Sequence, residues 1–465
     1  MAKSPSGAPA SPLSVIILAA GEGKRMKSAL PKVLQPLAGR PLLAHVIDTA
    51  RSLEPAAIHV VYGHGGESVR EALPDEPVSW TLQARQLGTG HAVLQAIPQV
   101  PDNHVALVLY GDVPLLSRQT LVQLVALVGP QQVALLTMTV DDPAGYGRIV
   151  RDPKGRVQRI VEQKDASAEE RAIRECNTGV IAAPAKLLKR WLEGLKADNS
   201  QREYYLTDII ATAVKDGVAV NPLGITEAIE ALGVNDKVQL ALLESECRRR
   251  AARELMLAGV TIADPSRVDI RGRVTHGKDV FIDVNVVLEG TVKLGDRVRI
   301  GPGCVVRNAE MGDDTQVFPH SVIEGAVIGA GCNIGPFARF RPTSRLSSGV
   351  HVGNFVEVKN STMAEDSKAN HLSYVGDAQV GARVNIGAGT IIANYDGANK
   401  HKTVIEDDVH TGSNSVLVAP ITIGAGATVA AGSTVASHVP GGKLTIARAR
   451  QTTIESWQRP RKPKK

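Results

Sequence analysis

A glycine-rich loop near the amino terminus is the first segment whose residues could do chemistry. The run Gly21-Glu22-Gly23-Lys24-Arg25-Met26 directly follows a short apolar stretch. Glycines let backbone N–H groups approach a phosphate, and the two cations could neutralise its charge. The spacing matches neither the GxGxxG dinucleotide loop nor the P-loop, which excludes both. Lys32, a few residues on, is a further candidate cation, although alone it would more often be a surface lysine.

An aspartate at the end of an apolar run could hold a metal ion. Asp112 lies in residues 110–115 (YGDVPL), at the end of the run 105–110. A carboxylate there suits Mg²⁺, which combines a few protein oxygens with substrate phosphates. Position alone supports a turn aspartate or a helix cap equally well. Asn235 similarly lies at a predicted helix start, where capping the helix is its simplest role.

The carboxyl-terminal half offers a candidate general base. His371 lies in residues 370–374 (NHLSY), and histidine is the usual base near neutral pH. Residues 355–359 (FVEVK) alternate as a strand and present Glu357 and Lys359 on one face. A lone histidine is more often structural or merely exposed, so these residue types leave the role of His371 open.

The amino-terminal half of the chain, to about position 230, must position the glycine loop and Asp112. Residues 15–20 (VIILAA), 58–62 (IHVVY) and 105–110 (VALVLY) are short buried-strand runs, and helical stretches such as 42–53 lie between them. Strands that alternate with helices predict a mostly parallel, doubly wound sheet. Ligands bind such sheets at the carboxyl ends of the strands, so function is expected just after Ala20 and Tyr110.

From about position 265 the sequence repeats with a period of six. This is the period of hexapeptide parallel β-helices, whose narrow interior takes small aliphatic side chains and whose corners suit glycine. His276 alone breaks the second series, and the polar segment 393–402 (ANYDGANKHK) interrupts the coils as a functional loop or a tolerated insertion. The first series is Val268, Val274, Val280, Val286, Val292, Val298 and Cys304, and the second is Ile270, Ile282, Leu288, Leu294, Ile300 and Val306.

Composition excludes several classes of protein. The chain has 465 residues, 43% of them hydrophobic, which predicts two or more domains and argues against general disorder. No apolar run approaches the length of about 18 residues that a membrane-spanning helix needs, and residues 1–13 lack the apolar core of a secretory signal. The four cysteines are far apart without CxxC spacing, which favours a reducing, cytoplasmic setting over a disulfide framework or a zinc site.

The net charge of +6 lies entirely in the carboxyl-terminal tail. Residues 448–465 contain seven basic residues and one acid, so residues 1–447 are formally neutral. Nucleic-acid binders usually carry a basic face on the folded body. Neither nucleic acid nor membrane is therefore expected as a partner, with contact through the tail kept as a minor alternative.

An ordered set of motifs resembles a known enzyme family. Residues 18–26 (LAAGEGKRM), followed by Pro31-Lys32, look like the signature of sugar-phosphate nucleotidyltransferases. The supporting motifs are residues 82–92 (LQARQLGTGHA), 110–115, 145–149 (GYGRI), 161–165 (VEQKD) and 177–179 (NTG). Together with the hexapeptide repeats, His371, residues 394–400 (NYDGANK) and Arg448, the chain resembles the bacterial bifunctional N-acetylglucosamine-1-phosphate uridyltransferase/glucosamine-1-phosphate acetyltransferase family from about residue 13 to its end.

This resemblance implies two reactions and an architecture. One domain would acetylate glucosamine 1-phosphate with acetyl-CoA, and the other would transfer uridylyl from UTP with Mg²⁺, giving UDP-N-acetylglucosamine for cell-envelope polysaccharides. Family members are homotrimers with acetyl-transfer sites between subunits. The implied fold is an α/β, Rossmann-like nucleotidyltransferase domain joined by a long helix to a left-handed parallel β-helix. The expected segments are a disordered tail (1–13), the uridyltransferase domain (14–234), a linker helix (235–260), the β-helix (261–447) and a basic tail (448–465).

The resemblance also implies site residues in the amino-terminal domain. Asp112 and Asn235 match metal ligands, and Arg25 and Lys32 match catalytic positions. Lys24 departs from the family, which often has threonine there. The implied UTP and UDP-sugar contacts are Leu18, Ala19, Ala20, Gly21, Lys32, Gln83, Gly88, Thr89, Tyr110, Gly111, Asp112, Gly147, Glu162, Asn177 and Asn235, with Gln83, Gly88 and Thr89 at the uracil and Gly147, Glu162 and Asn177 around the sugar.

A second set of residues is implied in the repeat domain. His371 matches the proton acceptor, Glu357 a residue that orients it, and Asn394 a reaction-centre position. The implied glucosamine 1-phosphate contacts are Arg341, Lys359, Tyr374, Asn385 and Lys400, and the implied acetyl-CoA contacts are Ala388, Asn394, Tyr395, Ser413, Ala431 and Arg448.

Two other functions remain to be weighed. The chain could be a single-function sugar-1-phosphate nucleotidyltransferase whose β-helix only assembles or regulates it. It could also be a scaffold with a degenerate catalytic domain. His371, the segment 393–402 and Arg448 favour the bifunctional enzyme over the first, and the presence of Asp112 and Lys32 argues against the second.

Overall fold

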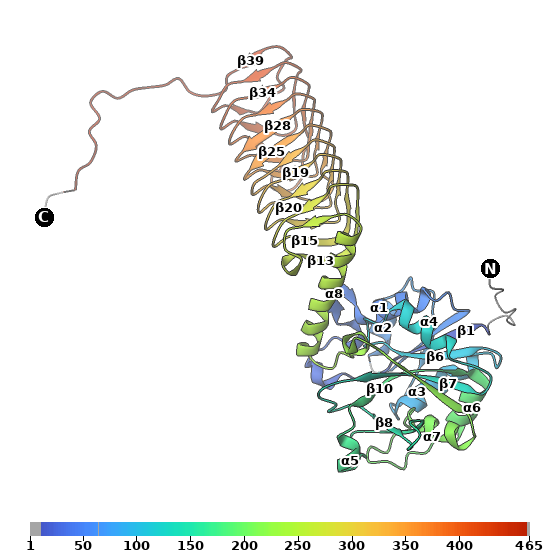
Figure 1. The fold of residues 1–465 in the computed structure, drawn as a ribbon. Coiled ribbons are helices and arrows are strands. Elements are labelled where there is room, and N and C mark those ends of the chain that lie inside the picture. Colours follow the sequence, from blue (N-terminus) through green and yellow to red (C-terminus); the bar gives the residue numbers. More distant parts are fainter. Residues whose placement is uncertain (1–10, 64, 463–465) are drawn as a thin grey trace. The chain divides into compact units, whose positions relative to one another are not determined.

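The computed structural model describes residues 11–63 and 65–462, so most of the expected amino-terminal tail and the last three residues lie outside it. The chain divides into two compact units, with the boundary between Cys247 and Arg248 (Figure 1). That boundary falls inside one long helix, α8 (Lys237–Leu257). We refer to the two parts as the amino-terminal unit and the β-helix unit.

A nine-stranded mixed sheet forms the centre of the described amino-terminal unit. β1, β4, β5 and β6 run parallel, β7 and β11 pair in parallel, and β10 runs antiparallel to both β6 and β7. The main order is β11 (Ala219–Gly224), β7 (Gln132–Thr139), β10 (Glu175–Pro184), β6 (Val105–Tyr110), β1 (Leu13–Ala19), β4 (Ala57–Tyr62) and β5 (Ser79–Leu82); β8 (Arg148–Arg151) and β9 (Val157–Val161) extend from β10, and β2 (Pro36–Leu37) pairs with β3 (Arg40–Pro41).

Helices cover both faces of this sheet. Along β1, Val15 and Ile17 belong to one buried cluster and Ile16 and Leu18 to another, because alternate strand residues point to opposite faces. The first cluster receives apolar residues of α1 (Leu42–Arg51), α2 (Gly66–Glu71) and α4 (Arg118–Ala126); the second receives those of α3 (Thr89–Ala96), α6 (Ala185–Glu193) and α7 (Asp208–Lys215). The short α5 (Ala168–Arg171) begins at a capping box of Ser167 and Glu170.

The parallel register aligns the carboxyl ends of β1 and β6. Leu18 pairs with Tyr110, and the amide of Gly111 donates to the Leu18 carbonyl at 2.9 Å. On the other side, the Gln83 amide donates to the Tyr62 carbonyl at 2.7 Å. The glycine loop, Asp112 and Gln83 therefore emerge from one edge of the sheet, where function was expected.

The β-helix unit stacks short parallel strands coil upon coil, consistent with the predicted left-handed β-helix (Figure 1). One series is β12 (Thr261–Ile262), β14 (Phe281–Ile282), β16 (Arg299–Ile300), β19 (Gln316–Val317), β22 (Asn333–Ile334), β25 (His351–Asn354), β28 (Lys368–His371), β31 (Asn385–Ile386), β34 (His410–Thr411), β37 (Thr428–Val429) and β39 (Leu444–Thr445). The other two faces are β13 (Asp269–His276), β15 (Val287–Leu294), β17 (Val305–Arg307), β18 (Glu310–Met311), β20 (Val322–Glu324), β21 (Val327–Ile328), β23 (Arg339–Phe340), β24 (Arg345–Leu346), β26 (Glu357–Lys359), β27 (Thr362–Met363), β29 (Tyr374–Gly376), β30 (Ala378–Val380), β32 (Ile391–Ala393), β33 (Thr403–Ile405), β35 (Val416–Val418), β36 (Ile421–Ile423) and β38 (Thr434–Val435).

The hexapeptide pattern forms the interior of the β-helix. Its aliphatic residues are almost all buried in one cluster, whereas Val274 and His276, in the first complete coil, are only partly covered. One coil is longer than its neighbours: β30 pairs with β33, Gln379 opposite Val404, because the segment 393–402 leaves the coil between them. Residues at the corners adopt positive φ, including the bulky Phe355 (φ 56°) and Leu372 (φ 51°). Stacked coils thus hold non-glycine residues in a conformation that L-residues rarely adopt.

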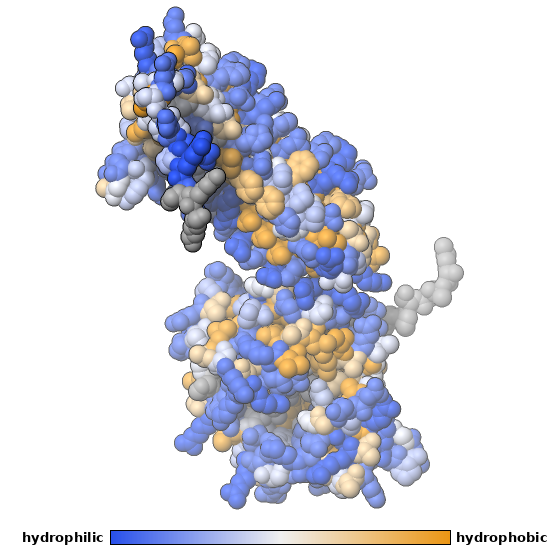
Figure 2. Space-filling view, turned by 90° about the vertical axis from the view of Figure 1, so that its left-hand side faces the viewer, coloured by the Kyte–Doolittle hydropathy of each residue, from blue (hydrophilic) through white to orange (hydrophobic). Residues whose placement is uncertain are grey.

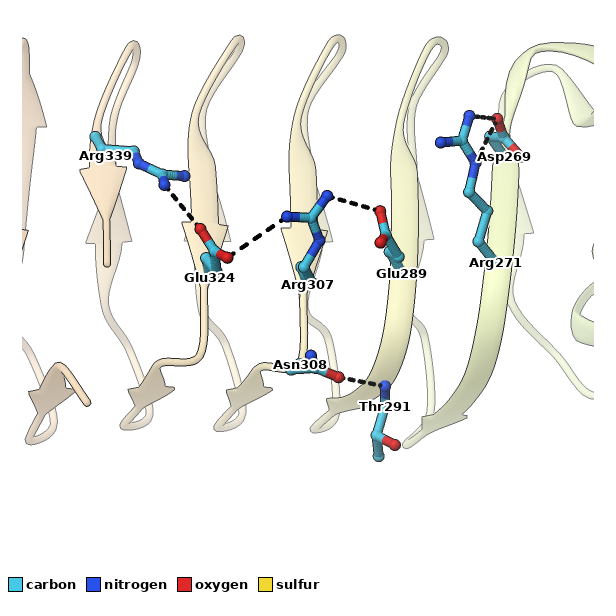
Figure 3. Close-up of polar contacts among 8 residues, drawn as sticks. All are labelled: Asp269, Arg271, Glu289, Thr291, Arg307, Asn308, Glu324 and Arg339. Carbon is cyan, nitrogen blue, oxygen red and sulfur yellow. Dashed lines mark hydrogen bonds and ion pairs between the residues drawn. The ribbon is translucent and has the colours of Figure 1, made fainter. Parts of the chain in front are cut away.

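A ladder of alternating charges runs along the outside of the first coils (Figure 3). Arg307 pairs with Glu289 at 2.9 Å and Glu324 at 3.5 Å, and Glu324 pairs in turn with Arg339 at 2.7 Å. At the nearby corner, the Oδ1 of Asn308 accepts from the amide of Thr291 at 3.0 Å. Each side chain contacts the coil before or after its own, so the ladder fixes coil against coil.

The described cysteines are all free thiols, three of them buried. In the part of the chain that the structure describes, no helix is both long and apolar enough to cross a bilayer.

We predict that Ile300→Ala destabilises the β-helix by about 2–5 kcal/mol, because Ile300 is fully buried and its truncation leaves a cavity in a narrow interior. Thermal unfolding followed by calorimetry measures the effect. Gln316→Ala is the control, since Gln316 lies exposed on the neighbouring strand β19. Equal melting temperatures for the two variants would contradict the assigned interior.

Candidate functional sites

A cavity of about 610 Å³ opens at the carboxyl edge of the amino-terminal sheet. It collects most of the residues implied for UTP, together with Gln86 and Ala92 of the motif 82–92 and two residues outside every quoted motif, Val33 and Glu203. The implied residues that line it are Leu18, Ala19, Ala20, Gly21, Lys32, Gln83, Gly88, Thr89, Tyr110, Asp112 and Asn235. Because these come from both ends of the unit's sequence and from its middle, the parallel register and the turn before α8 bring the site together.

Lys32 contacts both implied metal ligands, Asp112 and Asn235. Its ammonium forms an ion pair with Asp112 Oδ2 and donates to Asn235 Oδ1 at 3.4 Å. Lys32 lies in a single helical turn, η2 (Lys32–Leu34), and Gly23 allows its close approach. A Cβ on Gly23 would lie 2.6 Å from the Lys32 Cβ, and its φ of 65° also favours glycine. Two oxygens therefore converge on one positive charge.

Asn235 is free to face Lys32 because its neighbour caps the helix. Asp236 Oδ1 accepts from the amide of Gln239 at 2.9 Å, and Gln239 Oε1 accepts from the amide of Asn235 at 2.7 Å. The amide of Val234 donates to the Asp112 carbonyl at 2.9 Å, which ties this turn to the end of β6. The capping role considered for Asn235 belongs to Asp236.

The Asp112–Asn235 pair fits a hard divalent cation. Both donors are oxygens, and the Lys32 ammonium shows that a cation can contact them together. Among the described residues, no group of three or more histidine, cysteine, aspartate or glutamate side chains is arranged to hold a metal. A metal here would need substrate oxygens to complete its shell, which is how Mg²⁺ is usually bound with nucleotides.

A second cluster contains the positions implied for the sugar. The amide of Asn177 donates to the Gly147 carbonyl at 2.8 Å, and a Cβ on Gly147 would lie 3.5 Å from the Glu162 carboxylate. Burial raises the pKa of Glu162, although a hydrogen bond from Thr207 at 3.0 Å opposes the increase. Burial also raises the pKa of Tyr110, and the nearby carboxylates of Glu162 and Asp112 add to the increase. Tyr110 therefore links this cluster to the cavity.

Besides the residues of the second cluster, two implied residues do not line the cavity. Arg25, in the turn η1 (Lys24–Met26), is exposed, and no hydrogen bond or ion pair joins its side chain to another described residue. Gly111 packs beneath the site, where a Cβ would lie 3.2–3.3 Å from Leu43, Ala19 and Val33. Lys24, the departure from the family pattern, pairs with Glu22 at 2.6 Å and lines the cavity.

In the β-helix unit, His371 is exposed at the end of β28. Its Nδ1 contacts Asn354 Oδ1 at 3.0 Å. A carbonyl oxygen can only accept, so Nδ1 is the donor, and in the neutral imidazole the lone pair is then on Nε2. Glu357, implied as the orienting residue, instead pairs with Arg341 at 3.3 Å. Asn354 was missed, although it lies directly opposite His371 in the preceding coil of the same column.

His371 begins a column of residues that precede one corner of the β-helix. In successive coils the Gly389 amide donates to the His371 carbonyl, the Asn414 amide to that of Ala388, and the Gly432 amide to that of Ser413. The Arg448 guanidinium then donates to the Ala431 carbonyl at 2.9 Å. All residues implied for acetyl-CoA except Asn394 and Tyr395 thus continue the line of His371. We call it the His371 column: His371, Ala388, Ser413, Ala431 and Arg448.

The charge ladder stops alternating where the sugar phosphate is implied. Arg341 follows Glu324 in its column, but the next position is Lys359 rather than an acid. Lys359 lowers the pKa of Lys400, which shows that the two ammonium groups lie close together. Neither lysine forms an ion pair with a described carboxylate, although the charge of Asp377 raises the pKa of Lys400, and two neighbouring cations suit an anion.

The segment 393–402 folds back on itself beside these cations. Tyr395 pairs with Lys400, and Asp396 accepts from the amides of Ala398 and Asn399 while pairing with His401 at 2.6 Å. Asn394 is buried and donates to Tyr374 Oη at 3.4 Å.

Asp377 secures the base of this segment. It accepts from the side-chain amides of both Asn394 and Asn360, the latter at 2.6 Å. Sequence reasoning missed Asp377, whose only signal was its place at a corner. Asn385, implied for the sugar, lies exposed on β31, which pairs with β28.

Comparisons with known proteins agree with this division. Family models match a MobA-like NTP transferase domain at residues 15–205, a GMPPB C-terminal domain at 270–354 and a bacterial transferase hexapeptide of six repeats at 402–437. A solved nucleotidyl transferase from Methanothermobacter covers 51% of this chain and 98% of its own, at 19% identity and a TM-score of 0.38, too low to bear on the fold.

Curated relatives match nearly the whole chain. A protein from Aromatoleum aromaticum is 58% identical over 452 residues, covering 97% of this chain and 99% of its own length. One from an Azoarcus species is 58% identical over 448 residues, and one from Herminiimonas arsenicoxydans is 55% identical over 453. All three are named bifunctional protein GlmU. Their identity and coverage confirm the expected family and fold class, and the chain belongs to the bifunctional GlmU family.

Proposed function

We infer that this chain is a bifunctional enzyme with uridyltransferase and acetyltransferase activity, each on its own unit. The observation that carries this is the pair of separate, differently built sites: a nucleotide-sized cavity beside Asp112 and a base, His371, beginning a column along the β-helix. A β-helix that served only for assembly would need neither. Acetylation of glucosamine 1-phosphate precedes uridylyl transfer to the N-acetylated product.

Uridylyl transfer depends on positioning and charge neutralisation. An oxygen of the sugar phosphate attacks the α-phosphorus of UTP, and the bond to the β-phosphate oxygen breaks to release pyrophosphate. We propose that Lys32 and the backbone around Gly21 hold the triphosphate, with Arg25 moving in from its exposed position. Gln83, Gly88 and Thr89 would bind the uracil, and Glu162 and Asn177 the sugar.

Asp112 and Asn235 are the residues that would hold Mg²⁺, together with phosphate oxygens. The bound metal would offset the negative charge that gathers on the phosphates during transfer. The cation position between the two oxygens is taken by Lys32 in the structure. We therefore propose that Lys32 moves from this pair to the phosphates when nucleotide and metal bind.

Acetyl transfer requires a base for the attacking amine. The amine nitrogen of glucosamine 1-phosphate bonds to the thioester carbon, the carbon–sulfur bond breaks, and CoA leaves as the thiol. His371 Nε2 accepts the amine proton and passes it to the leaving sulfur, and Asn354, by accepting from Nδ1, selects the neutral tautomer whose lone pair is on Nε2. Arg341, Lys359 and Lys400 would bind the phosphate, and Tyr374, Asn385 and Asn394 the sugar and the reaction centre, with Glu357 acting through Arg341.

The His371 column is proposed to hold acetyl-CoA. Ala388, Ser413 and Ala431 are small, so an extended acyl arm can lie against the corner without obstruction. Arg448 lies four coils beyond His371, roughly 19 Å at about 4.8 Å per coil. A guanidinium at that distance suits the phosphates of CoA, and Tyr395 would contact the acyl end.

We propose that the protein acts as a cytoplasmic homotrimer with the acetyl-transfer site at the subunit boundary. Beside the His371 column, His320, Phe337 and Phe355 stack with ring centroids 5.2 Å apart. Phe355 is 56% exposed and Leu372 61%. Figure 2 shows apolar groups on the surface of the β-helix among mainly hydrophilic neighbours. An exposed apolar corner of this kind is typical of a surface that another subunit covers.

We predict that His371→Ala lowers the kcat of acetyl transfer by about 10²–10⁴, the usual contribution of a general base. CoA thiol release measures this step. Uridylyl transfer, followed by pyrophosphate release, should stay within error of the unmodified protein. His351→Ala is the control, because His351 lies on β25 outside the His371 column. Loss of both activities in a folded His371→Ala protein would refute two independent sites.

We expect Asp112→Ala to impair uridylyl transfer and to leave acetyl transfer intact. Pyrophosphate release should fall at every Mg²⁺ concentration, because one of two oxygen ligands is lost, while thiol release continues. Full uridylyl transfer by this variant would show that Asp112 is not a metal ligand.

Lys32→Met tests whether the ammonium occupies the metal position. Without nucleotide, we expect this variant to bind Mn²⁺ tighter than the unmodified protein by about tenfold, because a competing cation is removed. Electron paramagnetic resonance of free Mn²⁺ measures the affinity without any turnover. Lys24→Met, on the neighbouring loop, should leave it unchanged. Unchanged Mn²⁺ binding by Lys32→Met would contradict the competition.

A further inference from the structure

The side-chain amide of Gln83 is held in one orientation by two hydrogen-bonding contacts. Gln83 is 3% exposed, and its Nε2 donates to the Gly88 carbonyl at 3.1 Å and contacts His91 Nδ1 at 3.0 Å. A carbonyl oxygen can only accept, so the atom facing Gly88 is the NH₂ group. Both of its hydrogens are then used, one on Gly88 and one on His91.

His91 can accept this hydrogen bond only as a neutral imidazole. The NH₂ group of Gln83 faces Nδ1, so the lone pair lies on Nδ1; Nε2 lies 3.3 Å from the Gln95 side chain. Burial lowers the pKa of His91, which favours the neutral form near pH 7. His91 is the third residue of α3, and a helix places it rigidly.

The surroundings of His91 keep this arrangement from shifting. The amide of Tyr204 donates to the Leu87 carbonyl and the amide of Gly90 to the Tyr204 carbonyl, both at 2.8 Å. Gly88 has a φ of 109°, and a Cβ there would lie 2.6 Å from the Tyr204 carbonyl oxygen. The ring of Tyr204 lies beside His91 at 6.3 Å between centroids. The backbone of Tyr204 therefore holds the chain in place both before and after Gly88.

The remaining polar atom of Gln83 is an acceptor. Gln83 lines the cavity of the amino-terminal unit, and its Oε1 accepts no hydrogen bond from any described residue. We propose that His91 is a positioning residue for nucleotide selection: by holding the NH₂ of Gln83, it presents Oε1 to the N3–H of uracil. The proposal rests on the uridylyl activity proposed above and adds a residue that selects its nucleotide.

The chemistry of the bases makes this orientation selective. Uracil carries a hydrogen on N3, which an oxygen can accept. Cytosine has a lone pair on N3, which would face the lone pairs of Oε1. Without His91, only the Gly88 carbonyl holds the NH₂ group of Gln83, so the amide rotates more readily and accommodates either base. The strength of the selectivity therefore depends on a second acceptor at the position of His91 Nδ1.

Two substitutions separate this role from a structural one. His91→Leu removes the acceptor, whereas His91→Asn keeps one, because the side-chain oxygen of asparagine can take the place of Nδ1. Calorimetric titration with UTP and with CTP, each with Mg²⁺, gives the ratio of the two dissociation constants. We expect His91→Leu to lower the preference for UTP by about five- to tenfold, the effect of one hydrogen bond, and His91→Asn to restore most of it.

A further pair of variants keeps the test independent of folding. With Gln83→Ala as background, adding His91→Leu should not change the UTP/CTP ratio further, because His91 acts only through Gln83. Gln95→Leu, which removes the neighbour on the other ring nitrogen, should leave the ratio within twofold of the unmodified protein.

The outcomes distinguish this proposal from the one it rests on. If the unmodified protein binds UTP no better than CTP, the proposed uridylyl function is at fault. If it prefers UTP and His91→Leu keeps that preference, or if His91→Asn fails as His91→Leu does, the role of His91 is overturned.

Discussion

Parallel backbone hydrogen bonding is the constraint on which both units depend. In the sheet it aligns the ends of β1 and β6, so that loops far apart in the sequence meet at one edge. In the β-helix it recurs on each face of the stacked coils and converts sequence spacing into straight columns. His371, Ala388, Ser413 and Ala431 form a line for this reason, and the Arg448 guanidinium bonds to its last carbonyl. A change of register by one residue would turn each of these side chains toward a different face.

The pairing of charged side chains differs between the regular coils and the candidate sites. Along the first coils Arg307 and Arg339 pair with acids of neighbouring coils (Figure 3). At Lys359 the alternation ends, and this lysine lowers the pKa of Lys400, which the charge of Asp377 opposes. In the amino-terminal unit Lys32 supplies its own cation to Asp112 and Asn235. Both sites therefore keep charge that a substrate or a metal can satisfy.

Supporting residues do as much in these sites as the groups that face substrate. Asp236 caps α8 and so releases Asn235. Asn354 fixes the proton of His371, Asp377 holds Asn394, and His91 holds Gln83. Asn354, Asp377 and His91 each bond one atom of the partner residue, which fixes how that partner faces the site.

The secondary structure of much of this protein could be predicted from short patterns of neighbouring residues in the sequence. The strand runs at 15–20, 58–62 and 105–110, the helix near 42–53 and the hexapeptide repeat each depend on neighbours in the chain, and the structure has β1, β4, β6, α1 and the coils there. The ordered motifs also specified the family, which the relatives confirm. The segment boundaries and the roles of individual site residues stay predictions.

Only the tertiary structure decided which atoms face one another. It paired Glu357 with Arg341 rather than with His371, left Arg25 exposed, and gave the cap of α8 to Asp236. Those outcomes depend on the exact distances between side chains from different coils or strands and on how each side chain is oriented. Sequence spacing places residues in the same column or at the same edge, but it does not set which hydrogen bond each side chain makes.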